Sequence, residues 1–365
     1  MSRFWNERTK NLEPYVPGEQ PPDGRKIIKL NTNECPYPPS PAVRDVLAGF
    51  VGQQFSSLRL YPNADGQAVR EAFARRAGLD PAQVFVGNGS DEVLAVAFQA
   101  FYGGQAPLWL PEVSYSFYPV YCRLYGVPFR TIPMKKDLSV DLEQFLDKSS
   151  PCGGVALANP NAPTTLALDL GQIEALLRAH PDVVVLVDEA YVDFGGESAL
   201  SLVPQYENLL VVQTLSKSRA LAGLRVGFAA GSKDLIEGLD RVKNSFNSYP
   251  LDRIAIACAA ASLNDEENFR RTVDQMVATR ARAAEALAGM GFIVPDSKAN
   301  FLFVTHPRCR AEVLFQGLKK RGILVRHFSN PLINNYLRIS IGTDVEMDAL
   351  CFALKKLLEA NNALA

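Results

Sequence analysis

The sequence contains little of what metal sites and disulfide frameworks are built from. Only three of its 365 residues are histidines, and His180, His306 and His327 form no metal-like cluster. None of the six cysteines is part of a CxxC pair, and a chain of this length needs no disulfide framework to stabilise it. We therefore expect reduced thiols and no metal ion.

An excess of one charge and long apolar runs are also missing. The formal net charge is -1, which gives no reason to expect nucleic acid or an anionic membrane as a partner. The apolar runs, such as residues 183–187, are strand length, whereas a membrane span needs roughly 20 apolar residues. Residues 1–8 contain no apolar signal core, so we expect a cytoplasmic location.

What the sequence does contain is an alternation of apolar strands and helices, which is typical of a mostly parallel sheet covered on both faces. The predicted strands are residues 84–87, 107–110, 127–132, 154–157, 183–187 and 209–213. The predicted helices are residues 41–50, 66–77, 92–101 and 171–178, the third with Ser90 as its N-cap. Reactive groups in such α/β sheets gather beyond the carboxyl ends of the strands.

The pattern changes after residue 231, and a chain of this length is expected to hold about two domains. Residues 233–290 are rich in helix signals, and short strands and helices follow up to residue 357, which suits a smaller α+β domain. We predict an N-terminal arm that joins part of the small domain, a large domain and a small C-terminal domain. Their predicted bounds are residues 1–40, 41–245 and 246–365.

Lys217 is the candidate reactive amine. It follows the strand predicted at residues 209–213, and Arg225 comes eight residues later. An amine can form a Schiff base with an aldehyde cofactor, while hydroxyls such as those of Thr214 and Ser216, together with a guanidinium, can hold that cofactor's phosphate. A lone lysine in a loop is more often simply solvated, so the role of Lys217 depends on the residues around it.

Asp188 follows the apolar strand predicted at residues 183–187. A buried carboxylate is costly unless it is paired with a cation, and a protonated pyridine nitrogen is such a cation. An aspartate that caps backbone amides would give the same pattern. Three residues later, Tyr191 can donate to a phenolate oxygen or simply pack in the wall.

The sequence GNGSD at residues 87–91 is a glycine-bearing turn from a strand into a helix. The amides of Gly89 and Ser90 and the positive end of the helix can hold a phosphate there. An ordinary tight turn also uses glycines, and the carboxylate of Asp91 would compete for the same amides.

Asn161 and Tyr115 are weaker candidates. Asn161 lies in NPNAP at residues 159–163, where two prolines stiffen the turn and can present its amide toward a ring oxygen. Pure turn chemistry explains the same segment equally well. Tyr115 offers a face on which a ring can stack, although an aromatic residue in such a run is more often part of the core.

Arg338 lies in an apolar strand, where an unpaired guanidinium is expensive. Because a guanidinium matches carboxylate and phosphate in bidentate fashion, Arg338 and Arg326 are candidates for binding an anionic group of a substrate. Structural ion pairs are the equally good alternative.

Taken in order, these motifs resemble the fold-type I pyridoxal-phosphate aminotransferases, over nearly the whole chain. The motifs that carry the resemblance are PYVPGE at residues 14–19, NTNECPY at residues 31–37, the Tyr61-Pro62 pair and VDEAYVDF at residues 187–194. The resemblance implies an α/β fold, with a mostly parallel seven-stranded sheet covered by helices in the large domain and a smaller α+β domain. It also implies the cofactor pyridoxal 5'-phosphate.

The resemblance further implies a role for each candidate at the cofactor. Lys217 would bind the cofactor's aldehyde and shuttle the proton. Asp188 would pair with the pyridine nitrogen, and Asn161 and Tyr191 would hold the ring oxygen. Tyr115 would stack on the ring, and Asp91 would lie beside the phosphate. The phosphate would be surrounded by Gly89, Ser90, Thr214, Ser216 and Arg225.

Two more implications concern the substrate and a second subunit. The substrate pocket would be lined by Tyr15, Asn33, Arg326 and Arg338. Tyr61 would reach the phosphate of the neighbouring subunit's cofactor, which implies a homodimer. The sequence departs from the usual family pattern at residues 162–165, where asparagine and glycine are common at the first and last positions, and at Cys35.

The expected reaction is a transamination between a small-molecule amino donor, such as L-glutamate, and a keto acceptor. Three alternatives stay open from the sequence. They are an aminotransferase of aromatic or broad specificity, a decarboxylase of threonine phosphate on the same frame, and a non-catalytic regulator that keeps the cofactor-binding shell.

Overall fold

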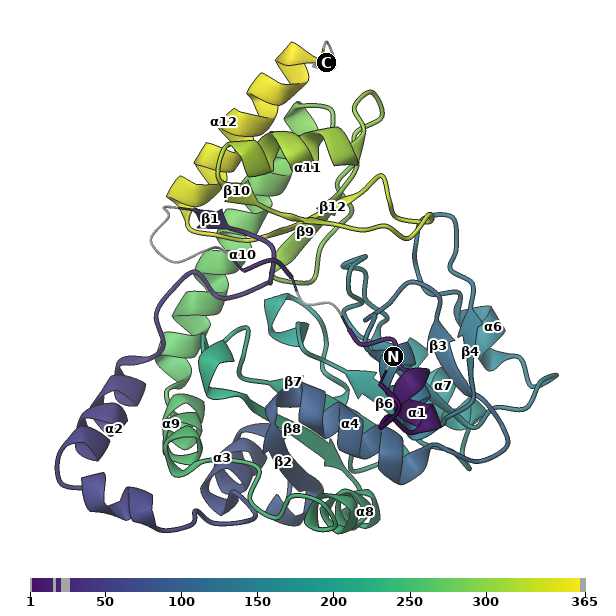
Figure 1. Cartoon of the computed structure of the whole chain (residues 1–365), viewed down its shortest axis with the longest axis vertical. Helices are drawn as coiled ribbons and strands as arrows, with labels where there is room; N and C mark the ends of the chain where they lie inside the picture. Colours follow the sequence, from purple (N-terminus) through teal and green to yellow (C-terminus); the bar gives the residue numbers. More distant parts are fainter. Residues whose placement is uncertain (1, 16–17, 21–26, 362–365) are drawn as a thin grey trace.

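The computed structural model describes residues 2–15, 18–20 and 27–361. Residues 16 and 17 of the PYVPGE motif and residues 21–26 of the predicted arm lie outside the described residues. The chain forms a lower part around a large sheet and an upper part around smaller sheets, with the long helix α10 (Glu266–Gly289) extending between them (Figure 1).

The large sheet has seven strands and is mostly parallel, as predicted. Across the sheet the strands are β2 (Val84–Asn88), β8 (Val226–Gly231), β7 (Leu209–Thr214), β6 (Val185–Asp188), β5 (Gly154–Ala158), β3 (Leu108–Pro111) and β4 (Phe129–Ile132). Strand β8 runs antiparallel to both of its neighbours, while the other neighbouring pairs are parallel. β8 is absent from the predicted strands because its sequence, VGFAAG, is rich in glycine and alanine.

Both faces of this sheet are buried, which explains its continuous apolar strands. In β6, Val185 and Val187 point into one core and Leu186 into another, as the two-residue period of a strand requires. The first core is covered by α3 (Gln67–Ala77), α7 (Leu170–Ala179) and α9 (Arg253–Asn264). The second core is covered by α4 (Gly89–Phe101), α5 (Tyr118–Tyr125) and α8 (Lys233–Asn244).

The upper part is a smaller α+β unit. Its three-stranded antiparallel sheet has the order β11 (Arg326–His327), β12 (Leu337–Ser340) and β9 (Phe301–Val304). A parallel pair joins β1 (Ile28–Lys29) to β10 (Ile323–Leu324), so the chain near residue 30 belongs to this unit. The covering helices are α11 (Ala311–Lys320) and α12 (Asp344–Ala360), together with the end of α10.

The division between the two cores differs from the boundary predicted at residues 245 and 246. Helix α9 packs against α3 and against α2 (Pro41–Val51), and its Ala255 and Leu263 lie in the core of the large sheet. Ala283 and Leu287, near the end of α10, lie in the core of the small unit. The cores therefore divide along α10, because tertiary packing assigns α9 to the large sheet.

The remaining elements are short. They are α1 (Glu7–Lys10), α6 (Leu142–Leu146) and short 3-10 helices at Phe55–Arg59, Pro81–Gln83, Val192–Phe194, Ala199–Leu202 and Ala222–Leu224. Helix α4 begins at Gly89, so the predicted N-cap Ser90 is wrong: the cap is Asn88, which makes no side-chain capping bond. No helix within the described ranges is long and apolar enough to cross a membrane.

Candidate active site

The candidate site is a cavity of about 310 Å³ at the carboxyl edge of the large sheet. It lies where β6 and β7 end, and residues 31–34 and strands β11 and β12 close it from the small unit. The structure brings together most of the residues predicted for the site. Those that line the cavity are Tyr15, Asn33, Ser90, Asp91, Tyr115, Asp188, Tyr191, Thr214, Ser216, Lys217, Arg225, Arg326 and Arg338.

Lys217 enters the cavity directly after strand β7. Its Nζ donates to the carbonyl oxygen of Thr32 over 3.4 Å, a long hydrogen bond, and lies 5.9 Å from the ring centroid of Tyr191. Lys217 is half-buried, whereas its neighbours Ser216 and Ser218 are buried. The amine is thus presented to the cavity with only a weak bond to hold it.

Asp188 is a buried carboxylate at the end of β6, only 5% exposed. The hydroxyl of Tyr118 donates to its Oδ2 over 2.9 Å, and the amide of Ala190 donates to its Oδ1 over 3.2 Å. No ion pair to Asp188 occurs among the described residues, and burial raises its pKa to about 6. The carboxylate therefore lacks the cation that would compensate its desolvation.

Hydroxyls, a guanidinium and a helix end converge at one wall of the cavity. Thr214 Oγ1 donates to Ser216 Oγ over 2.9 Å, and Arg225 Nη1 lies 3.5 Å from the same oxygen. Ser90 lies in the first turn of α4, whose amides have no side-chain cap. This group of donors suits a phosphate.

Gly89 does not line the cavity, but it allows this arrangement. It has a φ of +79°, and a Cβ at this position would run into the guanidinium of Arg225. A glycine therefore lets Arg225 lie across the start of α4.

Asp91 connects two of the predicted cofactor residues. Its Oδ1 accepts from the Tyr115 hydroxyl over 2.9 Å, and its Oδ2 accepts from Arg225 Nη2 over 3.0 Å. Asp91 therefore fixes Tyr115 and Arg225 at the same time, beside the group of phosphate donors.

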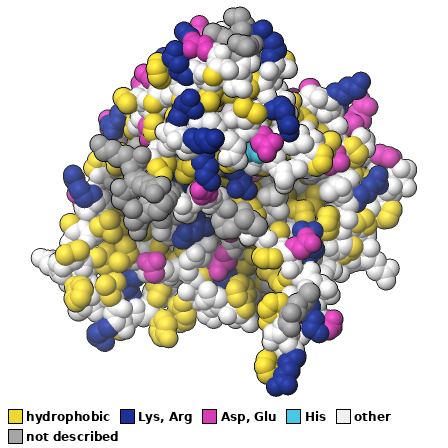
Figure 2. Space-filling model, turned by 45° about the horizontal axis from the view of Figure 1, so that its top comes forward, with side chains coloured by type: hydrophobic (Ala, Val, Ile, Leu, Met, Phe, Trp, Pro, Cys, Tyr) yellow, Lys and Arg dark blue, Asp and Glu magenta, His cyan; other side chains and the backbone are white. Residues whose placement is uncertain are grey.

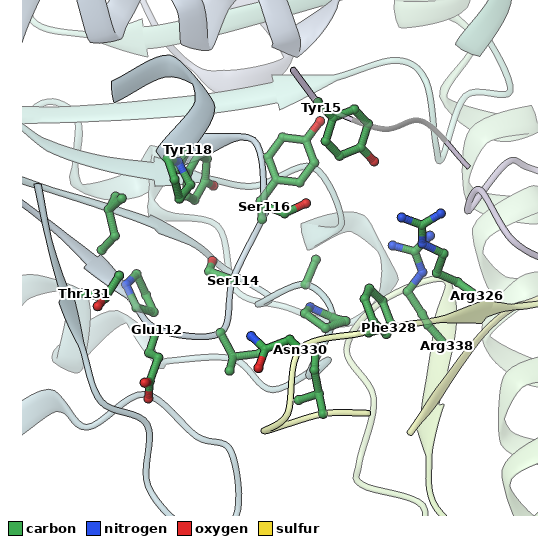
Figure 3. Close-up of a pocket in the computed structure, with 18 of the residues that line it drawn as sticks. Tyr15, Glu112, Ser114, Ser116, Tyr118, Thr131, Arg326, Phe328, Asn330 and Arg338 are labelled. Atoms are coloured by element: carbon green, nitrogen blue, oxygen red, sulfur yellow. The ribbon is translucent and has the colours of Figure 1, made fainter. Parts of the chain in front are cut away.

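Arg326 and Arg338 form the opposite, cationic wall. They are directly paired across β11 and β12, and Figure 3 shows their guanidinium groups side by side on the wall toward Tyr15. Arg338 Nη2 donates to the carbonyl oxygen of Asn31 over 2.7 Å, its Nε is buried without a partner, and burial lowers its pKa. Neither arginine has an acidic partner within the described ranges.

The structure engages the amide of Asn161 in its own turn, so its contact with a ring oxygen stays a prediction. Its Nδ2 donates to Val113 O and Thr164 Oγ1, both over 2.9 Å, and its Oδ1 accepts from Ser114 Oγ over 2.8 Å. The side chain is 2% exposed and stabilises its own turn, while the methyl group of Ala162 lines the cavity instead.

Tyr61 also lies away from the cavity of its own chain. It is 78% exposed and stacks on Tyr249 with ring centroids 4.8 Å apart. The role in a second subunit that the resemblance implies for Tyr61 stays a prediction.

Sequence reasoning missed Tyr118 and a second compartment. Tyr118 comes three residues after Tyr115, at the start of α5, and its hydroxyl reaches Asp188. The second compartment, of about 420 Å³, adjoins the first and extends between residues 111–116 and residues 328–333, past Glu112 and Asn330 (Figure 3). The polar tip of Tyr118 in an aromatic run was the only available signal; nothing in the sequence pairs the two loops.

Comparison with known proteins places this geometry in a family. Residues 25–354 match the model of the family Aminotransferase class I and II. The chain belongs to this family, whose members use pyridoxal 5'-phosphate.

Individual relatives agree over nearly the full length. The chain is 54% identical over 359 residues to a histidinol-phosphate aminotransferase of Marinomonas sp. (strain MWYL1), covering 98% of this chain and 100% of the relative. It is 52% identical to histidinol-phosphate aminotransferase 2 of Dechloromonas aromatica (strain RCB), with 98% and 99% covered. The fold matches that of histidinol-phosphate aminotransferase from Sinorhizobium meliloti in complex with pyridoxal-5'-phosphate, with a TM-score of 0.85, 24% identity and 99% of each chain covered.

The residues present fit pyridoxal phosphate on chemical grounds. Asp188 is a buried carboxylate with no ion-pair partner among the described residues, and a protonated pyridine nitrogen would supply one. Ser90, Ser216 and Arg225 offer donors for a phosphate, and Lys217 offers an amine for an aldehyde.

Proposed function

We propose that the protein transfers an amino group between L-histidinol phosphate and 2-oxoglutarate, giving imidazole acetol phosphate and L-glutamate, in histidine biosynthesis. The observation that carries the proposal is the arginine pair Arg326 and Arg338 on the wall of the cavity that holds Lys217, where neither has an acidic partner among the described residues. The names of the full-length relatives support the same substrate.

The two arginines must bind two different anions in turn, a carboxylate of glutamate and the phosphate of the other substrate. A guanidinium fork accepts both geometries, and Arg338 has an unused Nε to offer. Like charges directly opposite each other repel, so an anion bound between the two guanidinium groups also offsets their repulsion.

When bound, pyridoxal phosphate supplies an aldehyde that takes up the substrate's amine and a ring that draws electrons from its α-carbon. In this scheme Lys217 Nζ moves the proton at that carbon as the general base and acid. Asp188 holds a negative charge at the ring nitrogen, and Tyr118 fixes the direction of that carboxylate through its hydroxyl. Tyr115 covers the ring face, while Ser90, Thr214, Ser216 and Arg225 hold the phosphate.

The proposal includes a homodimer in which Tyr61 completes the partner's phosphate site. Tyr61 stacks on the exposed Tyr249, and Val51, Phe55, Leu58 and Leu60 in the same stretch of chain and Phe246 near Tyr249 are also exposed. Figure 2 shows apolar side chains gathered at the lower left of the molecule, on the side where Figure 1 places α2. Exposed apolar surfaces of this kind mark interfaces, which supports a second copy of the chain here.

Assays with histidinol phosphate, phenylalanine and threonine phosphate as alternative substrates test the reaction. Amino transfer from histidinol phosphate to 2-oxoglutarate at the highest kcat/KM is the expected result. Preference for phenylalanine would favour an aromatic or broad-specificity aminotransferase, and release of carbon dioxide from threonine phosphate would favour a decarboxylase. Absence of any turnover would favour a non-catalytic regulator.

Reduction with borohydride followed by peptide mapping tests the amine independently of the substrate. Cofactor attached at Lys217 is the expected result, and attachment at any other lysine contradicts the proposal. The cytoplasmic location stays a prediction, which cell fractionation would test.

A further inference from the structure

Residues 31–33 form a short connection between the small unit and the wall of the cavity. The carbonyl oxygen of Asn31 accepts from Arg338, that of Thr32 from Lys217 and that of Asn33 from Asn300. Asn33 has a φ of +56°, in the left-handed region where asparagine is better tolerated than most residues.

Asn33 is itself 1% exposed, and its polar groups are in use. Its backbone amide donates to Ser340 Oγ over 2.8 Å, and its Oδ1 accepts from the same hydroxyl over 2.9 Å. Its Nδ2 donates to the hydroxyl oxygen of Tyr191 over 3.0 Å. Asn33 also lines the cavity, and the substrate contact predicted for it from the sequence stays a prediction.

The orientation of the Asn33 amide follows from this network. Ser340 Oγ already accepts from the backbone amide of Asn33, so its one proton needs an acceptor, and Asn33 Oδ1 is the acceptor that the described residues provide. Asn33 Oδ1 therefore faces Ser340, and Nδ2 faces Tyr191.

The Tyr191 hydroxyl consequently accepts a hydrogen bond from Asn33 and keeps its own proton free. Among the described residues no acceptor for that proton lies within hydrogen-bonding distance, and Tyr191 lines the cavity. Next to Tyr191 the wall carries the methyl group of Ala162, because the amide of Asn161 is engaged in its own turn. Among the described residues, Tyr191 thus offers this corner a hydroxyl proton that has no acceptor.

We propose that Asn33 is a positioning residue, whose amide directs the Tyr191 hydroxyl proton into the cavity and toward the ring oxygen of the cofactor. This inference rests on the proposed function. In this role Asn33 does not contact the substrate. The small unit instead sets the direction of the Tyr191 hydroxyl through Ser340 and Asn33.

The measurable quantity is the pKa of the lysine-bound chromophore, followed by absorbance. A hydrogen bond donated to the ring oxygen stabilises its negative charge and lowers that pKa, so loss of the donor raises it. Glu34, Asp91, Asp188, Arg225, Arg326 and Arg338 also face the cavity, and all stay unchanged in the variants used.

The experiment is a double-variant cycle with Asn33→Gly and Tyr191→Phe. Glycine tolerates the positive φ and removes the amide without adding charge. Tyr191→Phe should raise the chromophore pKa by about one unit. Asn33→Gly should raise it by a few tenths to one unit in the wild-type background and leave it unchanged in the Tyr191→Phe background.

Asn33→Asp provides the reverse test. It keeps the shape and the bond to Ser340 but replaces the donor by an acceptor that draws the Tyr191 proton away. Asn33→Asp should therefore raise the chromophore pKa more than Asn33→Gly does. An equal effect of Asn33→Gly in both backgrounds, or no effect in either, would overturn the inference. A wild-type chromophore without turnover of histidinol phosphate would contradict only the proposed substrate, whereas a protein that binds no cofactor at Lys217 would contradict both.

Discussion

Arg326 and Arg338 lie directly opposite each other on the antiparallel strands β11 and β12, and neither has an acidic partner among the described residues. Like charges at directly opposed positions destabilise a sheet. Both arginines are half-buried, and the Nε of Arg338 is buried without a partner among the described residues. Under the proposed function, a bound anion would offset the repulsion between them.

Replacing Arg338 by lysine should weaken binding of both anionic substrates. A lysine keeps the charge but loses the fork and the bond to Asn31, so KM for glutamate and for histidinol phosphate should rise about 10- to 100-fold. Steady-state kinetics with each substrate measures this change. Arg241→Lys, on the exposed face of α8, is the matched control and should leave both KM values unchanged. An unaltered KM in Arg338→Lys would exclude Arg338 from the anion site.

Replacing Gly89 by alanine should weaken cofactor binding beyond its effect on folding. Gly89 and Gly78 have similar positive φ values, +79° and +68°, but only at Gly89 would a Cβ meet another group, the guanidinium of Arg225. Both alanine variants should lose about 1 kcal/mol of unfolding free energy through backbone strain. Only Gly89→Ala should also raise the Kd for pyridoxal phosphate, by about tenfold or more.

Fluorescence titration of the cofactor and urea unfolding separate these two effects. Equal Kd values for Gly89→Ala and Gly78→Ala would mean that Arg225 does not bind the phosphate.

Replacing Asp188 by asparagine should stabilise the cofactor-free protein at neutral pH. Burial raises the pKa of Asp188 from 3.8 to about 6, so the folded state favours the protonated form. The corresponding stability is present below pH 3.8 and is lost as pH rises to about 6, by up to about 3 kcal/mol. An asparagine does not ionise, so the variant's gain in unfolding free energy over the wild type should be full at pH 8 and should shrink as pH falls toward 5.

Thermal unfolding of cofactor-free wild type and variant across this pH range is the measurement. With cofactor bound the order should reverse, because the variant lacks the charge that pairs with the ring nitrogen. A variant that is less stable at pH 8 without cofactor would contradict the account of Asp188 as an uncompensated charge.

The architecture could be predicted because its signal is local. Apolar strands buried on both faces have a recognisable composition, as at residues 183–187 and 209–213, and the residues at their carboxyl ends converge by topology alone. Strand β8 was not predicted because glycine and alanine carry little strand signal, although pairing with β2 and β7 on both sides stabilises it.

The direction of individual side chains could not be predicted in the same way. Asn161 stands in the turn where an amide was expected, but Val113 O and Thr164 Oγ1 take its donors, and this depends on contacts between distant segments. The hydrogen bond from Asn33 to the Tyr191 hydroxyl depends on the packing of the small unit against the large one. Sequence order identifies which residues gather at the site, whereas hydrogen-bond partners decide which of them face the cavity.

The proposed dimer makes the strongest prediction about Tyr61. If Tyr61 acts in the partner's site, a Lys217→Ala chain and a Tyr61→Ser chain are each defective alone, but a mixed dimer contains one intact site. That site combines Lys217 from one chain with Tyr61 from the other. After unfolding and refolding an equal mixture, about one site in four should be intact, and activity should recover in proportion.

Separate refolding of each variant is the control and should recover no such activity. Tyr61 is 78% exposed, so its substitution should leave the fold of each chain unchanged in circular dichroism. Val51→Asp, in the same exposed stretch of chain, should lower both dimerisation and recovery of activity, since it places a charge in the proposed interface without touching the cavity. If mixing restores no activity although mixed dimers form, Tyr61 does not act across the interface.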